Sequence, residues 1–254
     1  MAHIISFVNQ KGGVGKTTSA VNIAAALGDL GKRVLLVDTD PQGNATSGVG
    51  ISKKNITRSM YDVIIERSSA ADAVVRTKFK NLSVLPSHIS LAGAELELVD
   101  AEKRESRLKK ALDSIKSDYD YIIIDCPPSL GLLSINALAA STGVIIPMQC
   151  EYYALEGLTQ LMLTIKLVKK HYNSNLEIVG IMITMYNGRL NLSLQVMDEL
   201  KKYYADKLFK TAIVRNVKLS EAPSFGEPIL YYDKYSKGCT AYKEIADELL
   251  ERLS

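Results

Sequence analysis

The amino-acid sequence predicts an α/β fold, with a mostly parallel, twisted sheet of about seven or eight strands and helices on both faces. Three observations lead to this prediction. Short apolar runs rich in isoleucine and valine recur along the chain. Amphipathic stretches with the periodicity of helices separate these runs. A glycine-rich segment stands between the first apolar run and the first amphipathic stretch.

The apolar runs are interpreted as strands buried on both faces, because their hydrophobic residues do not alternate strictly with polar ones. Parallel strands that are covered by helices on each side have this pattern. The expected strands span residues 3–9, 33–38, 82–86, 119–127, 142–149 and 176–185.

The stretches between the strands place apolar residues three and four positions apart, which is the spacing of one helix face. The expected helices span residues 16–30, 90–98, 104–117, 154–171, 190–204 and 238–252. This alternation indicates βαβ units, whose strands pair in parallel. No internal repeat, low-complexity segment or linker interrupts it. We therefore expect residues 1–254 to form a single domain without an N-terminal helix-turn-helix module.

The composition is that of a globular protein, with 254 residues, 47% of them hydrophobic and 23% charged. A formal net charge of +3 is too small to indicate a nucleic-acid partner, so any basic surface must be local. The three cysteines form no C-x-x-C pair, and their odd number favours a reducing compartment. Neither a signal-peptide pattern nor a run of about 18 apolar residues is present, so we expect a cytoplasmic protein with no membrane partner.

The segment "VNQKGGVGKTT", residues 8–18, resembles the phosphate-binding template G-x-x-x-x-G-K-[ST]. Gly15, Lys16 and Thr17 match the end of the template, whereas Gln10 stands where it has its first glycine. The segment follows a predicted strand and opens a predicted helix, as this motif requires. Its glycines allow backbone N–H groups to approach phosphate oxygens, and the helix start adds a positive dipole. The sequence therefore predicts a P-loop NTPase domain.

This loop is expected to bind ATP or ADP together with Mg²⁺. Lys16 would reach the β and γ phosphates, and the Thr17 hydroxyl would bind Mg²⁺. Further nucleotide contacts are expected from Lys11, Gly12, Gly13, Val14, Gly15 and Thr18. Lys11 is additional to the template. It is either a solvated surface charge or a lysine that reaches the phosphates of a second molecule, as an arginine finger does in trans.

Two acidic residues follow predicted strands, at the sheet edge where open α/β sheets bind ligands. Asp40 comes after the second strand, in "VDTDPQGNATSG", and would orient the attacking water or accept its proton. The alternative is that Asp40-Pro41 only begins a turn. Asp125 ends "YIIID" and would support Mg²⁺, often through water. Cys126 is interpreted as a small buried residue, because no histidine lies near it in the sequence.

Five segments together resemble the ParA family of chromosome-partitioning ATPases, and within it the short chromosomal Soj type. They are "NQKGGVGKTT", "LLVDTDPQGNATSG", "YDYIIIDCPPSLG", "PMQCEYYALEG" and "RNVKLSEAPSFG". The resemblance extends from about residue 3 to the last predicted helix. This family has a deviant phosphate loop, which lacks the first glycine and carries a signature lysine. Gln10 and Lys11 match that pattern.

The resemblance implies roles for individual residues. Lys11 would contact the partner's phosphates in an ATP sandwich dimer. Asp40 would be the acid required for hydrolysis, and Asp125 would support Mg²⁺, both acting on the metal through water. Arg215 and Asn216 belong to a segment that helps to hold the adenine in the family. Val214 replaces the proline that is common there, so the base contacts are less closely matched.

The resemblance also implies a functional cycle. An ATP-bound homodimer binds double-stranded DNA without sequence specificity and associates with the nucleoid. A DNA-binding partner of the ParB/Spo0J type stimulates hydrolysis and releases an ADP-bound monomer. Some chromosomal members also influence replication initiation or sporulation.

Basic side chains suited to DNA phosphates are concentrated late in the chain. Residues 201–218 carry six lysines and arginines against one acid, and Arg189 stands just upstream, where the family has an arginine that contacts DNA. Such contacts give salt-dependent, sequence-independent affinity, which pairing in a dimer increases. A solvated helix face is the alternative for the lysines. The candidate DNA-binding residues are Arg189, Lys201, Lys202 and Lys218.

Three other functions remain open from the sequence. A MinD-like ATPase that cycles on membranes would need a basic amphipathic tail, but "AYKEIADELLERLS" contains more acids than bases. A metabolic P-loop enzyme would act on a small substrate, for which no pocket is evident. An iron–sulfur ATPase would share a cluster through paired cysteines, and Cys126 and Cys150 do not match that pattern.

Overall fold

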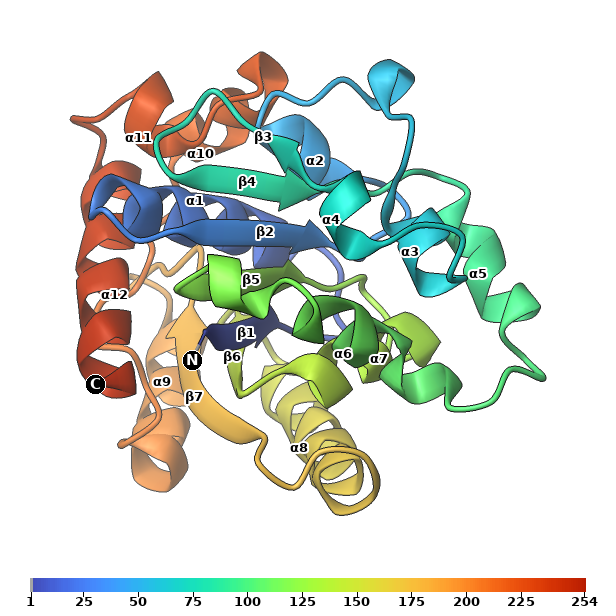
Figure 1. Ribbon diagram of the computed structural model, residues 1–254. Coiled ribbons are helices and arrows are strands. Elements are labelled where there is room, and N and C mark those ends of the chain that lie inside the picture. The colour runs from blue at the N-terminus through green and yellow to red at the C-terminus, as the bar shows by residue number, and fades with distance from the viewer. Residues whose placement is uncertain (1) are drawn as a thin grey trace.

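The computed structural model describes residues 2–254 and contains a seven-stranded sheet with helices on both faces (Figure 1). The strand order is β3-β4-β2-β5-β1-β6-β7. Neighbouring strands are parallel except for the β3–β4 pair. The strands are β1 His3–Phe7, β2 Val34–Asp38, β3 Val75–Arg76, β4 Leu82–Leu85, β5 Tyr121–Asp125, β6 Gly143–Met148 and β7 Glu177–Ile183. The predicted fold class is confirmed.

Each of the six expected strands contains a strand of the sheet. The seventh, β3, was not predicted. Its two residues are exposed and pair antiparallel with β4 at the sheet edge. A strand this short has too few positions for any periodicity to appear in the sequence.

The six expected helices correspond to α1, α5, α6, α8, α9 and α12, which span Lys16–Asp29, Leu91–Glu97, Arg107–Asp113, Ala154–His171, Asn191–Tyr204 and Lys237–Leu253. Six further helices were not predicted: α2 Asn44–Gly48, α3 Met60–Ile64, α4 Ala70–Ala73, α7 Leu132–Ala140, α10 Val217–Glu221 and α11 Ile229–Tyr232. Of these α7 is the longest. Its sequence "LLSINALAA" is apolar on almost every side and mostly buried, so it has no amphipathic pattern to recognise.

The prediction of one continuous helix over residues 104–117 is wrong. A 3₁₀ turn at Arg104–Ser106 precedes α6, and another at Lys116–Asp118 follows it. The N–H of Ile115 donates to the carbonyl of Leu112, three residues back, at 3.1 Å. Such 3₁₀ turns are common at the ends of α-helices, and Leu112 and Ile115 both remain buried in the core.

Alternate residues of the central strands pack into two separate cores, one on each face of the sheet. Ile4 and Ile122 belong to the core that α3 to α9 cover, whereas Ile5 and Ile123 belong to the core under α1, α2 and α10 to α12. This explains why the strands lack strict alternation in the sequence: both of their faces need apolar residues. In Figure 1 helix α12 runs along the α1 side of the sheet.

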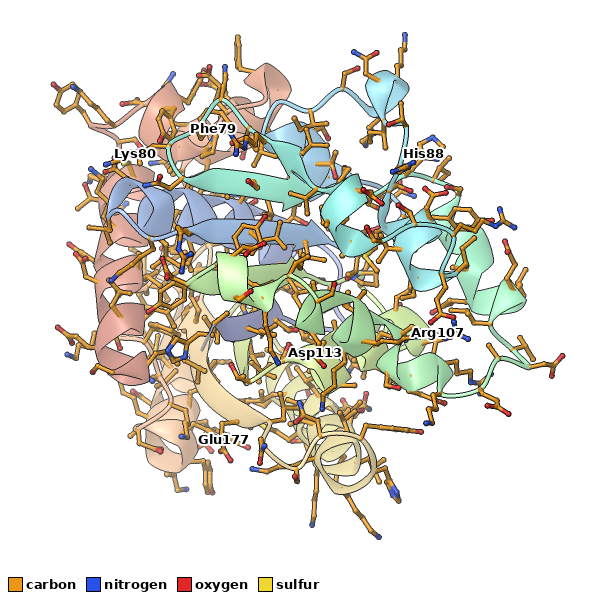
Figure 2. The ribbon with its side chains drawn as sticks, viewed as in Figure 1. Phe79, Lys80, His88, Arg107, Asp113 and Glu177 are labelled. Carbon is orange, nitrogen blue, oxygen red and sulfur yellow. The ribbon has the colours of Figure 1, made fainter. Side chains whose placement is uncertain are left out.

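Three central strands end side by side, and this shared end positions the candidate site. The register pairs Asp125 of β5 with Phe7 of β1 on one side and with Asp38 of β2 on the other. Strand β4 runs parallel to β2 and therefore shows in which direction the central strands run. Figure 2 shows Phe79 before its start and His88 beyond its end, on opposite sides of the molecule.

Candidate functional site

The loop of residues 8–15 connects β1 to α1 at this edge. Gly13 and Gly15 have φ angles of 76° and 83°, a left-handed conformation that favours glycine. Gly12 does not need this conformation, and a Cβ added to it would meet no atom closer than 3.9 Å. Two of the three glycines are therefore required by the backbone. The third leaves room for a ligand to approach.

Neighbouring side chains hold the start of the loop in place. The Asn9 amide donates to the carbonyl of Pro147 at 2.8 Å, and its oxygen accepts from the N–H of Lys11 at 3.0 Å. Gln10, which replaces the template's first glycine, turns toward α8, where its Nε2 donates to Gln160 Oε1 at 2.8 Å. The glutamine that replaces the template's glycine therefore joins the loop to helix α8.

The two lysines of the loop differ in environment. Lys16, the first residue of α1, is buried, and its Nζ donates to the carbonyl of Lys11 at 3.0 Å. Burial lowers the pKa of Lys16, and the nearby Asp125 offsets this only in part. Lys11 forms an ion pair with Glu151 at the surface, with side chains 44% and 49% exposed.

Asp125 has the properties of a metal-supporting acid. Both of its carboxylate oxygens are fully buried and have no hydrogen-bond partner among residues 2–254. Burial and the neighbouring Asp38 raise the pKa of Asp125 well above its usual value. The Thr17 hydroxyl lies close enough to lower this pKa in part, although the pair does not reach hydrogen-bond geometry. The unpaired carboxylate and the adjacent hydroxyl fit a hydrated Mg²⁺, for which oxygen ligands and retained waters are typical.

Asp40 lies in a turn that directly follows β2. Its Oδ1 accepts from the N–H of Gln42 at 2.9 Å, and its carbonyl accepts from the N–H of Gly43 at 2.9 Å. The turn that was the alternative for Asp40-Pro41 is thus present. It uses one carboxylate oxygen and does not exclude a chemical role for the other.

Asp38 is a residue of this site that the sequence analysis did not select. It is fully buried and accepts from both the N–H and the hydroxyl of Thr46, at 2.8 and 2.7 Å. It also accepts from the N–H of Asp40 at 3.2 Å. Burial is the main cause that raises the pKa of Asp38 to about 6. Asp38 therefore positions the loop that carries Asp40. The signal available in the sequence was an acid at the last position of a buried strand.

A cleft of about 230 Å³ adjoins the end of the phosphate loop. Arg215 and Asn216 line it together with Gly15 and Thr18, so the structure brings the predicted base-binding segment beside the loop. Asn216 Oδ1 accepts from the N–H of Lys218 at 2.8 Å and caps α10. The same cleft is lined by Thr184, Met185 and Tyr242, which the sequence analysis did not select.

Comparison of the sequence with known proteins identifies relatives of this chain. A family model described as an AAA domain matches residues 2–178. The chain is 57% identical to the sporulation initiation inhibitor protein Soj of Bacillus subtilis, over 98% of each chain. It is 51% identical to the chromosome partitioning protein ParA of Myxococcus xanthus, over 99% of this chain and 89% of that one. The chain belongs to the ParA/Soj family of chromosome-partitioning ATPases.

A solved structure extends the likeness to three dimensions. The structure of cobyrinic acid a,c-diamide synthase from Mycobacterium smegmatis with bound ADP and magnesium has a TM-score of 0.87 and 38% identity. The similarity covers 100% of this chain and 96% of that chain. The likeness supports the predicted α/β fold class along the whole chain.

In this ParA/Soj chain the candidate DNA-binding residues do not form one cluster. Arg189 lies in the exposed turn before α9, and the N–H of Tyr186, just ahead of that turn, donates to the carbonyl of Ile213 at 2.9 Å. This contact brings the turn beside the segment that contains Lys218. Lys218 forms an ion pair with Glu221 at 2.9 Å. Lys201 and Lys202 are exposed in the last turn of α9, about 15 Å from its start.

The tail helix and the cysteines bear on two of the alternative functions, the membrane-cycling ATPase and the iron–sulfur ATPase. The apolar face of α12 is buried against α1, so this helix does not offer that face to a membrane. Within the described part of the chain, no helix has the length and apolar character needed to cross a bilayer. Cys126, Cys150 and Cys239 are buried and unpaired. Burial raises the pKa of Cys126, which agrees with its interpretation as an inert core residue.

We expect Asp125→Asn to stabilise the ligand-free protein at about pH 7.5 by about 1–2 kcal/mol, because it removes a buried, unpaired charge. An acid whose pKa is raised by folding favours the folded state below its unfolded pKa, and this contribution is lost as pH rises through the folded value. The gain should therefore shrink as the pH falls toward about 4, near the unfolded pKa of an aspartate. The same variant should weaken Mg²⁺-dependent nucleotide binding.

Urea denaturation at neutral and acidic pH measures this effect, with Asp100→Asn as the control at an exposed acid. A gain that is independent of pH, or a loss of stability at neutral pH, would contradict the account of Asp125.

Proposed function

We propose that this protein is an Mg²⁺-dependent ATPase that dimerises on ATP, binds DNA without sequence specificity and acts in chromosome partitioning. The observation that carries the proposal is 57% identity to Soj of Bacillus subtilis over 98% of both chains. The buried Lys16, the unpaired Asp125 and the Asp40 turn at one sheet edge support it. We also propose that residues 1–254 act as one ATPase domain, since both cores share the same sheet.

Each residue of the site has a role in hydrolysis. Lys16 neutralises charge on the β and γ phosphates, and loop N–H groups orient them. Mg²⁺, held by Thr17 and through water by Asp125 and Asp40, would supply further charge neutralisation when bound. Asp40 orients the attacking water and takes up its proton. Arg215 and Asn216 contact the base from the adjoining cleft.

Lys11 is proposed to contact the phosphates of a second copy, as the family's signature lysine does. We expect Lys11→Ala to weaken the ATP-bound dimer by about tenfold or more, the value of one charge-assisted hydrogen bond, and ATP binding to the monomer much less. Sedimentation equilibrium with the slowly hydrolysed analogue ATPγS measures the first effect. ADP titration measures the second. Glu151→Ala is the matched comparison, because it removes the surface partner of Lys11 and leaves the lysine. Equal losses of dimer and nucleotide affinity for Lys11→Ala would contradict this role.

DNA binding is proposed to depend mainly on Arg189, because it lies near the ATP edge and projects from an exposed turn. A dimer would present two such arginines, so we expect Arg189→Ala to weaken DNA binding by about tenfold or more and to reduce the salt dependence by about two phosphate contacts. Dimerisation should be unchanged. Lys218, Lys201 and Lys202 are proposed to add smaller contributions, since Lys218 is ion-paired and the other two lie at the far end of α9.

Fluorescence anisotropy with a short duplex over a range of salt concentrations measures the loss for Arg189→Ala. The Lys201→Ala/Lys202→Ala double variant provides the comparison. A larger loss in the double variant than in Arg189→Ala would place the DNA surface at the other end of α9.

The partner that stimulates hydrolysis is proposed to be a DNA-binding protein of the ParB/Spo0J type. The ATP-bound dimer would associate with the nucleoid in the cytoplasm, and effects on replication initiation or sporulation would follow from this cycle. The similarity to partition proteins named Soj and ParA supports this assignment.

A metabolic role is the second candidate, because the solved structure described above carries the name of a synthase at 38% identity. The higher identities to partition proteins favour the first function. Size-exclusion chromatography with light scattering separates the two. The wild type and Asp40→Ala are compared in ADP and in ATP, with and without DNA. A protein that stays monomeric in ATP and ignores DNA would contradict the partitioning function.

A further inference from the structure

Two carbonyl groups of the phosphate loop are held by side chains from the neighbouring strand ends. The Gln149 Nε2, one residue after β6, donates to the carbonyl of Gly13 at 2.8 Å. The Thr184 hydroxyl, one residue after β7, donates to the carbonyl of Val14 at 2.8 Å. Both contacts join segments that are more than a hundred residues apart in the chain.

These contacts set the orientation of two peptide groups. In a trans peptide the C=O of one residue and the N–H of the next point in opposite directions. Holding the Gly13 carbonyl toward Gln149 therefore directs the Val14 N–H to the other side. Holding the Val14 carbonyl toward Thr184 does the same for the Gly15 N–H. Gly13 and Gly15, with positive φ, allow the loop to make this turn but do not select the orientation.

Gln149 also contacts Met185, a residue of the cleft of about 230 Å³ that contains Arg215 and Asn216 and is called the base cleft below. Its Nε2 lies 3.1 Å from the sulfur of Met185, and Met185 lines the cleft beside the phosphate loop. Met185 has a φ of 50°, an unfavourable conformation for a residue with a side chain, so surrounding contacts must hold it. Gln149 is therefore a direct connection between the loop and the wall of the cleft.

We propose that Gln149 and Thr184 are positioning residues for nucleotide binding: they turn the N–H groups of Val14 and Gly15 toward the phosphates. Gln149 in addition holds Met185 at the base cleft. The inference rests on the proposed ATP binding. It adds two residues outside the phosphate loop whose hydrogen bonds pre-organise that loop, which lowers the cost of ordering it around a ligand.

Thr184 offers a clean test because its methyl and hydroxyl groups do different things. The methyl lies 3.5 Å from where a Cβ on Gly15 would stand, so it packs against the loop, whereas the hydroxyl makes the hydrogen bond. Thr184→Val keeps the shape and removes the hydroxyl. Thr184→Ser keeps the hydroxyl and removes the methyl.

The experiment measures the affinity of monomeric protein for ADP and for inorganic pyrophosphate by calorimetric titration or competition. Thr184→Val should weaken both by the same factor, about five- to tenfold, the value of one buried hydrogen bond. Thr184→Ser should stay within about twofold of the wild type, because its hydroxyl can still donate to Val14. Melting of the ligand-free proteins is recorded in parallel.

Gln149→Met, which keeps the length of the side chain and removes its donor, is the second variant. It should weaken pyrophosphate binding about as much as Thr184→Val does, and ADP binding more, because the support of Met185 is also lost. Its ligand-free melting temperature should stay close to that of the wild type.

Wild-type affinity for Thr184→Val, equal losses in Thr184→Val and Thr184→Ser, or affinity losses that merely follow the melting temperatures would overturn the inference. These outcomes are separate from a failure of the proposed function. If the wild type itself binds neither ADP nor pyrophosphate, the nucleotide assignment is wrong, whatever the variants do.

Discussion

Asp40→Ala is expected to lower the rate of ATP hydrolysis by about 100-fold or more while ATP remains bound, because it removes the group that orients the water and accepts its proton. The phosphate loop, Lys16 and Asp125 are untouched, so nucleotide affinity should change little. Since hydrolysis ends the bound state, the ATP-bound dimer and its complex with DNA should accumulate. Phosphate release measures the rate, and light scattering with and without DNA measures the dimer.

Asp40→Asn separates chemistry from structure at this position. The amide oxygen of asparagine can still accept from the N–H of Gln42 and so keep the turn. It cannot take up a proton at neutral pH. We expect both variants to lose hydrolysis. Recovery of the wild-type rate in Asp40→Asn would mean that Asp40 only shapes the turn, and hydrolysis at the wild-type rate in Asp40→Ala would refute the mechanism.

Lys16→Ala is expected to weaken binding of ADP and ATP by about 100-fold or more, because two charge-assisted hydrogen bonds to phosphate are lost in a buried site. Lys16 now donates to the carbonyl of Lys11, and its pKa is lowered by burial. The buried charge of Lys16 therefore destabilises the ligand-free fold, and bound nucleotide phosphates would offset this destabilisation. The variant should remain folded, with a melting temperature at or above that of the wild type.

Titration with a fluorescent ADP analogue and thermal melting test this pair of effects together. Lys109→Ala, at an exposed position on α6, is the matched control. If Lys16→Ala retains wild-type affinity for the nucleotide, the assignment of Lys16 to phosphate binding is wrong. One that melts far below the wild type would show that Lys16 supports the fold.

The sequence was most informative where a local pattern has one physical cause. The strands of the central sheet follow from isoleucine and valine runs, and the loop at residues 8–18 follows from glycine spacing between a strand and a helix. It was least informative where a segment is apolar all round, as in α7, or where an α-helix is flanked by 3₁₀ turns, as on both sides of α6. In α7 the neighbours, and not the local pattern, decide the conformation.

Along the chain, the residues of the phosphate loop, Asp40 and Asp125 could be selected because each stands at a recognisable position relative to a strand or helix. The segment at Arg215 was selected only from its resemblance to the ParA family. Lys11 and Gln10 could be recognised as departures from a template. The candidate DNA-binding lysines could not be ranked, since charge in a sequence does not reveal ion pairs such as Lys218–Glu221.

Contacts between distant segments were decided by the tertiary structure alone. The register of β2 and β5 places Asp38 next to Asp125, and the strand order brings Gln149 and Thr184 against the phosphate loop. A glutamine or threonine after a strand has no pattern that distinguishes it, because its hydrogen-bond partner lies more than a hundred residues away. Local sequence therefore specified the phosphate loop and its lysines, whereas the orientation of the loop's peptide groups depends on a sheet that must first assemble.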